Sequence, residues 1–117
     1  MLKFVGLLCA GMIATGAYAQ SCPEIRFAPG ASSGVVSGNV VEDGVACFRF
    51  GAGAGQTATA RIIAEPIGDL CLVVIGEVDC LQSEYTWKTQ RGTQELRVGH
   101  MYRSVGTTPF KLELSIR

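Results

Sequence analysis

The stretch Ile25–Thr57, IRFAPGASSGVVSGNVVEDGVACFRFGAGAGQT, decides the fold class of this chain. Its short apolar runs alternate with polar residues and are interrupted by glycine and proline. Period-two alternation places Phe48 and Phe50 on one face of a strand and Cys47 and Arg49 on the other. The stretch therefore predicts stacked β-hairpins, each strand with one buried and one solvated face.

The rest of the 117-residue chain continues this pattern. No segment of ten or more residues carries an apolar stripe with a 3.6-residue period between helix caps. Turn residues such as Pro29-Gly30, Asp43-Gly44 and Arg91-Gly92 separate the candidate strands. The sequence predicts an all-β protein, a single small jelly-roll-like β-sandwich of about eight strands. The predicted strands are Glu24 to Phe27, Gly34 to Val40, Val45 to Phe50, Thr57 to Ala64, Leu70 to Ile75, Glu84 to Thr89, Gln94 to His100 and Phe110 to Ile116.

Two such sheets bury the apolar side of every strand, and the last strand has the clearest pattern. Its alternate residues Phe110, Leu112, Leu114 and Ile116 point to the core. The other predicted core residues are Ile25, Phe27, Val36, Phe48, Phe50, Ile62, Leu72, Val74, Tyr85, Trp87, Leu96 and Val98.

Residues 1–19, MLKFVGLLCAGMIATGAYA, have the features of a secretory signal peptide. Lys3 precedes an apolar body, and Ala17-Tyr18-Ala19 forms a small-x-small cleavage site. A transmembrane anchor is the alternative, but it needs about 20 apolar residues, and glycine and threonine interrupt this segment. We expect residues 20–117 to form one β-sandwich domain, periplasmic or secreted, without membrane insertion after signal cleavage.

The charge of the predicted mature domain is nearly balanced. Loss of Lys3 leaves 10 − 1 = 9 Lys and Arg against 10 Asp and Glu. A sequence-independent nucleic-acid binder needs a strongly basic face, so no nucleic-acid partner is expected.

Cleavage also removes Cys9 and leaves four cysteines, Cys22, Cys47, Cys71 and Cys80, which predict two disulfides in an oxidising compartment. Of the three possible pairings, the local one joins Cys71 to Cys80 around Gly76 and leaves Cys22 for Cys47. Their wide spacing disfavours zinc, so no metal site is expected. Lipidation of Cys22 is a further alternative, but it would leave an odd number of thiols.

No catalytic set is recognisable. His100 is the single histidine, and it is predicted to be a solvated residue at a strand end. No G-x-S-x-G elbow is present. The carboxylate pairs Glu42-Asp43 and Glu77-Asp79 lie in predicted turns. The glycine-rich run from Gly51 to Gly55 lacks the helix that a dinucleotide fingerprint requires. We expect no enzyme activity and no cofactor.

The loop from His100 to Pro109, HMYRSVGTTP, is the most prominent candidate for recognition. Met101, Tyr102 and Arg103 are residue types that binding hot spots favour, and they join two well-patterned strands. The alternative is an ordinary connection with Tyr102 packed on the sandwich edge.

Four motifs resemble the family of bacterial inhibitors of goose-type lysozyme: Ile25 to Ser33, Val36-Ser37-Gly38, Phe48-Arg49-Phe50 and Ala54-Gly55-Gln56-Thr57. That family is similar to pre-peptidase C-terminal domains, which are small jelly-roll sandwiches. The resemblance continues through Gly92 to Val98 and Phe110 to Ile116. It implies a non-enzymatic protein that occludes the glycan cleft of a goose-type lysozyme with a loop.

In this family, basic and aromatic loop residues meet the acidic groove of the enzyme, and Arg103 followed by Ser104 falls at such a loop arginine. The expected partner-binding residues are His100, Met101, Tyr102, Arg103 and Ser104. The alternative function is an accessory module that binds cell-wall glycan or another envelope protein. Its sugar platform would be Trp87, Tyr85 or Tyr102.

Overall fold

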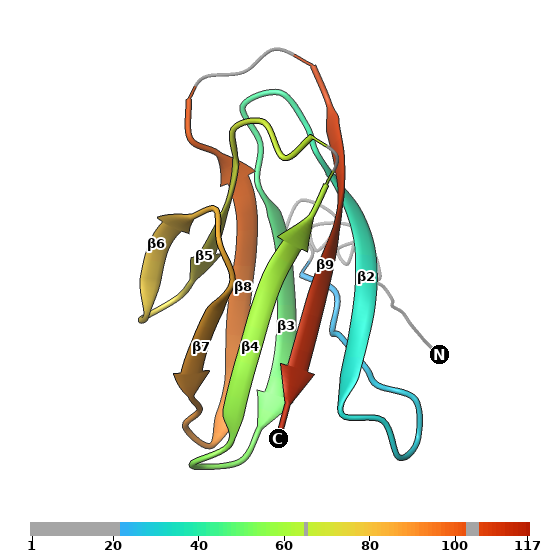
Figure 1. Cartoon of the computed structure of the whole chain (residues 1–117), viewed down its shortest axis with the longest axis vertical. Helices are drawn as coiled ribbons and strands as arrows, with labels where there is room; N and C mark the ends of the chain where they lie inside the picture. Colours follow the sequence, from blue (N-terminus) through green and yellow to red (C-terminus); the bar gives the residue numbers. More distant parts are fainter. Residues whose placement is uncertain (1–21, 65, 103–105) are drawn as a thin grey trace, which may run out of the picture.

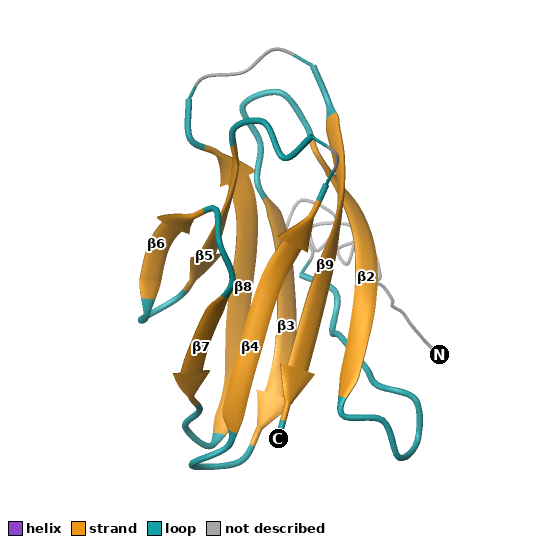
Figure 2. Ribbon diagram, viewed as in Figure 1, coloured by secondary structure: helices purple, strands orange, loops and turns teal. Residues whose placement is uncertain are grey.

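The computed structural model describes residues 22–64, 66–102 and 106–117. This part of the chain contains eight strands and no helix, so it holds none that is long and apolar enough to cross a membrane (Figure 2). The predicted all-β class is confirmed. The strands are β2 (Ser33–Val40), β3 (Ala46–Ala52), β4 (Thr57–Ile63), β5 (Leu70–Val74), β6 (Val78–Leu81), β7 (Tyr85–Lys88), β8 (Gly92–His100) and β9 (Thr108–Ile116).

The strands form two four-stranded antiparallel sheets, with the orders β2-β9-β4-β7 and β3-β8-β5-β6 (Figure 1). This interleaved order is that of a jelly roll, as predicted. The expectation of stacked hairpins in Ile25–Thr57 is wrong, however. Because β2, β3 and β4 alternate between the sheets, their connections arch across the sandwich. Among the described strands, β5 and β6 are the only consecutive ones that pair.

The core lies between the two sheets and is centred on the inner strands β8 and β9. Leu96 and Val98 from β8 and Leu112 and Leu114 from β9 are completely buried. Aromatic side chains connect the layers, since the rings of Phe48 and Phe110 lie 6.1 Å apart edge to face. Most of the predicted core is confirmed. The structure adds the buried residues Val40, Ala58, Ala60 and Leu70.

The predicted strand from Glu24 to Phe27 is not a strand. The segment makes one parallel bridge, Glu24 to Arg49, in which Arg49 N donates to Pro23 O over 3.0 Å and Ile25 N donates to Arg49 O over 2.7 Å. Pro23 has no N–H to donate and so limits further pairing. Ile25 is nevertheless buried, because its side chain covers the core beside β3.

The two disulfides are Cys22–Cys47 and Cys71–Cys80. Of the three possible pairings, this is the one in which the local bridge joins Cys71 to Cys80. The first holds the N-terminal segment on β3, and the second joins β5 to β6, a strand absent from the sequence prediction. A register shift interrupts the β5–β6 pairing, and Cys80 has a φ of 58°, so the alternation that marks other strands is lost here.

The lower end of the sandwich is held together by Thr89, which is buried at the β7–β8 turn. Its hydroxyl donates to Gly53 O over 2.6 Å and accepts from Gln56 N over 3.2 Å. Gly55 N also donates to Thr89 O over 2.8 Å. The glycine-rich β3–β4 connection is thus fixed by backbone and hydroxyl hydrogen bonds to the neighbouring turn.

Candidate functional site

The loop predicted for recognition emerges at the upper end of the sandwich, between β8 and β9 (Figure 1). Tyr102 is 72 % exposed and Met101 is 37 % exposed, so both side chains are available to a partner. Tyr102 is therefore not packed on the sandwich edge. Arg103 and Ser104, the other two predicted loop residues, lie outside the described residues.

His100 was expected to be solvated, and the structure corrects this. Its side chain is 5 % exposed, and its Nδ1 lies 2.9 Å from Asp69 Oδ1. A carboxylate can only accept, so Nδ1 carries the proton and donates. The other ring nitrogen, Nε2, is buried without a hydrogen-bond partner among the described residues. His100 thus anchors the base of the loop and does not present its ring to solvent.

The main chain of Asp69 also holds the base of the loop, because Met101 N donates to Asp69 O over 2.7 Å. We expect Asp69→Ala to lower the free energy of unfolding by about 1–3 kcal/mol, because it leaves both ring nitrogens of His100 buried without a partner. Asp69→Asn keeps an acceptor oxygen and should cost less. Urea denaturation of both variants checks this; equal losses would contradict a role for the hydrogen bond.

A groove of about 550 Å³ lies beside the loop base, on the outer face of the β3-β8-β5-β6 sheet. It brings His100, Met101 and Tyr102 together with residues that sequence reasoning did not connect to the site. Exposed Val45 and Ile75 give the groove an apolar character, and the Cys71–Cys80 disulfide lines it. No local pattern signals this grouping, because sheet pairing alone brings these segments side by side.

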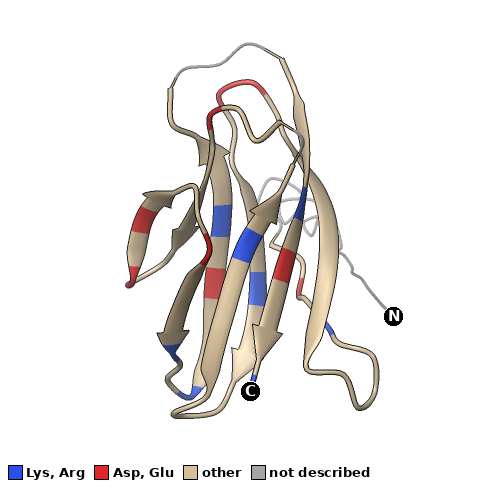
Figure 3. Cartoon of the chain, viewed as in Figure 1, with Lys and Arg blue, Asp and Glu red and all other residues tan. Residues whose placement is uncertain are grey.

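The charged residues of the groove are Asp43, Asp79 and Arg97. Arg97 Nε lies 2.7 Å from Glu95 Oε2, and Arg49 lies 3.7 Å from the other oxygen of Glu95. Glu95 therefore engages both arginines on this face. Figure 3 shows that the described upper loops carry acidic residues. Arg103 follows Tyr102 in the sequence and lies outside the described residues.

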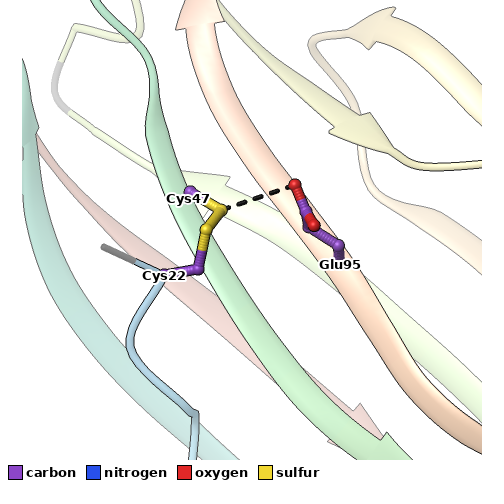
Figure 4. A group of neighbouring side chains, drawn as sticks. All are labelled: Cys22, Cys47 and Glu95. Atoms are coloured by element: carbon purple, nitrogen blue, oxygen red, sulfur yellow. Dashed lines mark hydrogen bonds between the residues drawn. A yellow bond between two sulfur atoms is a disulfide. The ribbon is translucent and has the colours of Figure 1, made fainter. Parts of the chain in front are cut away.

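Cys22, Cys47 and Glu95 bring two sulfurs and a carboxylate within 4.8 Å of one another (Figure 4). Cys47 Sγ lies 3.5 Å from Glu95 Oε2. A disulfide sulfur carries no hydrogen to donate, so we treat this approach as a packing contact. The sulfurs are oxidised and cannot act as thiolate ligands of a metal ion. The cluster is therefore a structural disulfide next to a carboxylate.

The sugar platform proposed for an accessory module is not available at Trp87. This ring is 5 % exposed and packs edge to face on Phe50 at 6.1 Å, with Tyr85 stacked on it at 5.8 Å. Tyr85 OH donates to Glu77 Oε1 over 3.1 Å. Burial first and this hydrogen bond second raise the pKa of Tyr85. Both rings belong to the packed side of the sandwich.

No protein-family profile and no curated protein matches the chain in sequence. Several solved structures match it in fold. Aeromonas hydrophila PliG, a periplasmic inhibitor of g-type lysozyme, has a TM-score of 0.65 at 19 % identity, covering 83 % of this chain and 96 % of PliG. Salmonella Typhimurium PliG has a TM-score of 0.65 at 21 % identity, covering 85 % of this chain and 100 % of PliG.

A third match is the pre-peptidase C-terminal domain of collagenase from Bacillus anthracis. Its TM-score is 0.58 at 13 % identity, and the match covers 85 % of this chain and 97 % of that domain. At such identities the likeness concerns the fold. The chain therefore has the jelly-roll fold that the PliG lysozyme inhibitors share with this pre-peptidase C-terminal domain, as the sequence resemblance predicted.

Proposed function

We propose that this protein is a non-enzymatic inhibitor of goose-type lysozyme that acts in the periplasm or after secretion. The observation that carries the proposal is the shared fold. PliG structures described as periplasmic g-type lysozyme inhibitors match 83–85 % of this chain and nearly all of their own length. The predicted signal peptide, residues 1–19, and the two disulfides agree with an oxidising compartment outside the cytoplasm.

The contact surface in this proposal is the upper end of the sandwich. Exposed Tyr102 and Met101 stand beside an apolar groove, and Tyr and Arg provide the large contact areas typical of binding hot spots. The Asp69–His100 hydrogen bond holds the loop base, which lowers the entropy lost on binding. Arg103 and Ser104, the next two residues in the sequence, are the proposed contacts to the acidic cleft of the enzyme.

A non-enzymatic role is supported by the state of His100. It is the single histidine of the chain, its ring is buried, and its Nδ1 is engaged by Asp69. A general base has to reach a proton of the substrate within hydrogen-bond distance. The buried ring lacks this access.

Inhibition is tested by mixing the purified protein with goose-type lysozyme and following lysis of bacterial cell walls. We expect slower lysis, and we expect Tyr102→Ala and Arg103→Ala each to weaken inhibition by about 1–3 kcal/mol, or roughly 5- to 150-fold. The matched control is Lys111→Ala, which removes an exposed cation on β9 and should inhibit as well as the wild type. Unchanged lysis at micromolar wild-type protein would refute the proposal.

A further inference from the structure

The described cations comprise paired arginines, three unpaired cations near one end of the sandwich, and Lys111 on β9, which is also unpaired. Each described arginine on or beside the sheet faces has a carboxylate partner: Arg26 with Glu24, Arg49 and Arg97 with Glu95, and Arg61 with Glu113. Lys88, Arg91 and Arg117 are exposed, and none of them forms an ion pair with another described residue. Lys88 ends β7, Arg91 lies in the β7–β8 turn and Arg117 follows β9; Figure 3 shows blue segments at this lower end and red segments in the upper loops. We call these three residues the basic end.

Sheet register places two of these cations on the same rung. Thr57 pairs with Lys88 of β7, and on its other side it exchanges two main-chain hydrogen bonds of 2.9 Å with Arg117. Residues opposite each other across antiparallel strands point to the same face. With strands about 4.8 Å apart, the Cα atoms of Lys88 and Arg117 lie roughly 10 Å apart on the outer face. Lys88 Nζ also donates to Thr57 Oγ1 over 2.8 Å.

The next rung is made entirely of hydroxyl side chains. Ser33 of β2, Ser115 of β9, Thr59 of β4 and Thr86 of β7 follow one another across the whole sheet. The hydroxyls of Thr59 and Thr86 lie 2.9 Å apart. We call these four residues the hydroxyl row. A hollow of about 300 Å³ connects this row to Thr57 and Arg117 of the basic rung.

Carboxylates lie next to the hydroxyl row on the side away from the basic end. Arg61 on the following rung is hydrogen-bonded to Glu113 and also interacts with Glu84, which lines the same hollow. The charge on this face therefore changes from positive to neutral and then to negative over three successive rungs. A terminal carboxylate at Arg117 would remove one charge from the basic end and leave an excess of two. Such a gradient orients a ligand with its anionic groups over Lys88 and Arg117.

The side chains on these two rungs indicate the class of partner. A protein interface needs an apolar centre, and neither rung carries a large apolar side chain. Single-stranded nucleic acid binds through aromatic stacking, and neither rung carries an aromatic side chain. Hydroxyl groups suit the hydroxyls of a sugar chain, and lysine and arginine suit carboxylates spaced along it.

We propose that the basic end and the hydroxyl row bind peptidoglycan, with stem carboxylates on Lys88, Arg91 and Arg117 and the glycan strand along the hydroxyl row. This site is separate from the upper loop, so it adds wall binding to the proposed inhibition. A protein held on the wall by its lower end would keep its upper loop directed away from the wall.

The test is co-sedimentation of the protein, purified from a bacterial periplasm, with insoluble peptidoglycan. Chitin is the matched uncharged polymer, because it has an N-acetylglucosamine backbone without carboxylates. We expect binding to peptidoglycan and little to chitin, with loss in about 0.5 M NaCl because salt screens exposed charges. Equal binding to chitin, or no binding to either polymer, would overturn the proposal.

Charge reversal locates the site. The double variant Lys88→Glu/Arg91→Glu should reduce binding at least about tenfold. The control is Lys111→Glu, which should leave binding unchanged. Lys111 is an exposed cation on the same face and has no ion pair among the described residues. Thr59→Val/Thr86→Val keeps the charge and the strand preference and should reduce binding several-fold. Equal loss in Lys111→Glu, or equal wild-type affinity for duplex DNA, would show that net charge alone is responsible and would refute the site.

The proposed lysozyme inhibition is scored separately, with a soluble chromogenic lysozyme substrate. The Lys88→Glu/Arg91→Glu variant should inhibit as well as the wild type in that assay. Arg103→Ala should sediment with peptidoglycan as well as the wild type. Circular dichroism melting of every variant shows whether it is folded, so failure of one proposal leaves the other intact.

Discussion

Replacing Cys22 and Cys47 together with alanine is expected to lower the free energy of unfolding by about 3–4 kcal/mol. The bridge spans 25 residues of sequence and joins the N-terminal segment to β3, so its loss frees a long loop in the unfolded chain. That segment makes one isolated bridge to the sheet and places Ile25 in the core. We therefore expect detachment of the segment as well as lower stability, measured by guanidinium denaturation with and without reductant.

The matched control is Cys71→Ala/Cys80→Ala, which removes a bridge spanning only 9 residues. The chain-entropy relation predicts a loss of about 2–3 kcal/mol, roughly 1 kcal/mol less than for the longer bridge. β5 and β6 also keep their turn and part of their pairing without the bridge. A larger loss for the short bridge would contradict the entropic argument.

Leu112→Ala is expected to lower the free energy of unfolding by about 2–5 kcal/mol. Leu112 is completely buried on β9, an inner strand, where it lies between Val36 of β2 and Ile62 of β4. Truncation leaves a cavity in the middle of the sheet, and neighbours paired on both sides have little freedom to fill it. The loss is measured by urea denaturation with matched m-values.

Lys111→Ala is the control for Leu112→Ala because it changes the adjacent residue on the solvated face of the same strand. Its stability should be close to that of the wild type. If the two variants lost equal stability, the assignment of the buried and solvated faces of β9 would be wrong. The two variants together thus test the register of the most clearly patterned strand.

The position and exposure of the β8–β9 loop were predictable from sequence because they depend on residue type and local pattern. The exposed loop with Tyr102 follows from a polar, glycine-containing segment between two patterned strands. The role of His100 was not predictable, since its partner Asp69 is 31 residues away and meets it only where β5 pairs with β8. The groove and the hydroxyl row likewise depend on strand order.

The error over Trp87 has a similar cause. Alternation correctly placed Trp87 among the core residues, yet an aromatic side chain on a short strand also suits a sugar platform. Its packing on Phe50 joins β7 to β3, a strand of the other sheet. Contacts between layers leave no local trace in the pattern of either strand.

The sequence by itself determined the all-β class, most strand positions, the inward faces and the four cysteines available for disulfides. These properties follow from period-two alternation, turn residues and cysteine count, which act over a few residues or over composition. Only the tertiary structure decided which sheet each strand joins. A turn rich in glycine can close a hairpin or arch to the opposite layer, and the choice depends on burying both faces of the whole sandwich. That choice assembled the groove at the upper end and the basic end at the lower one.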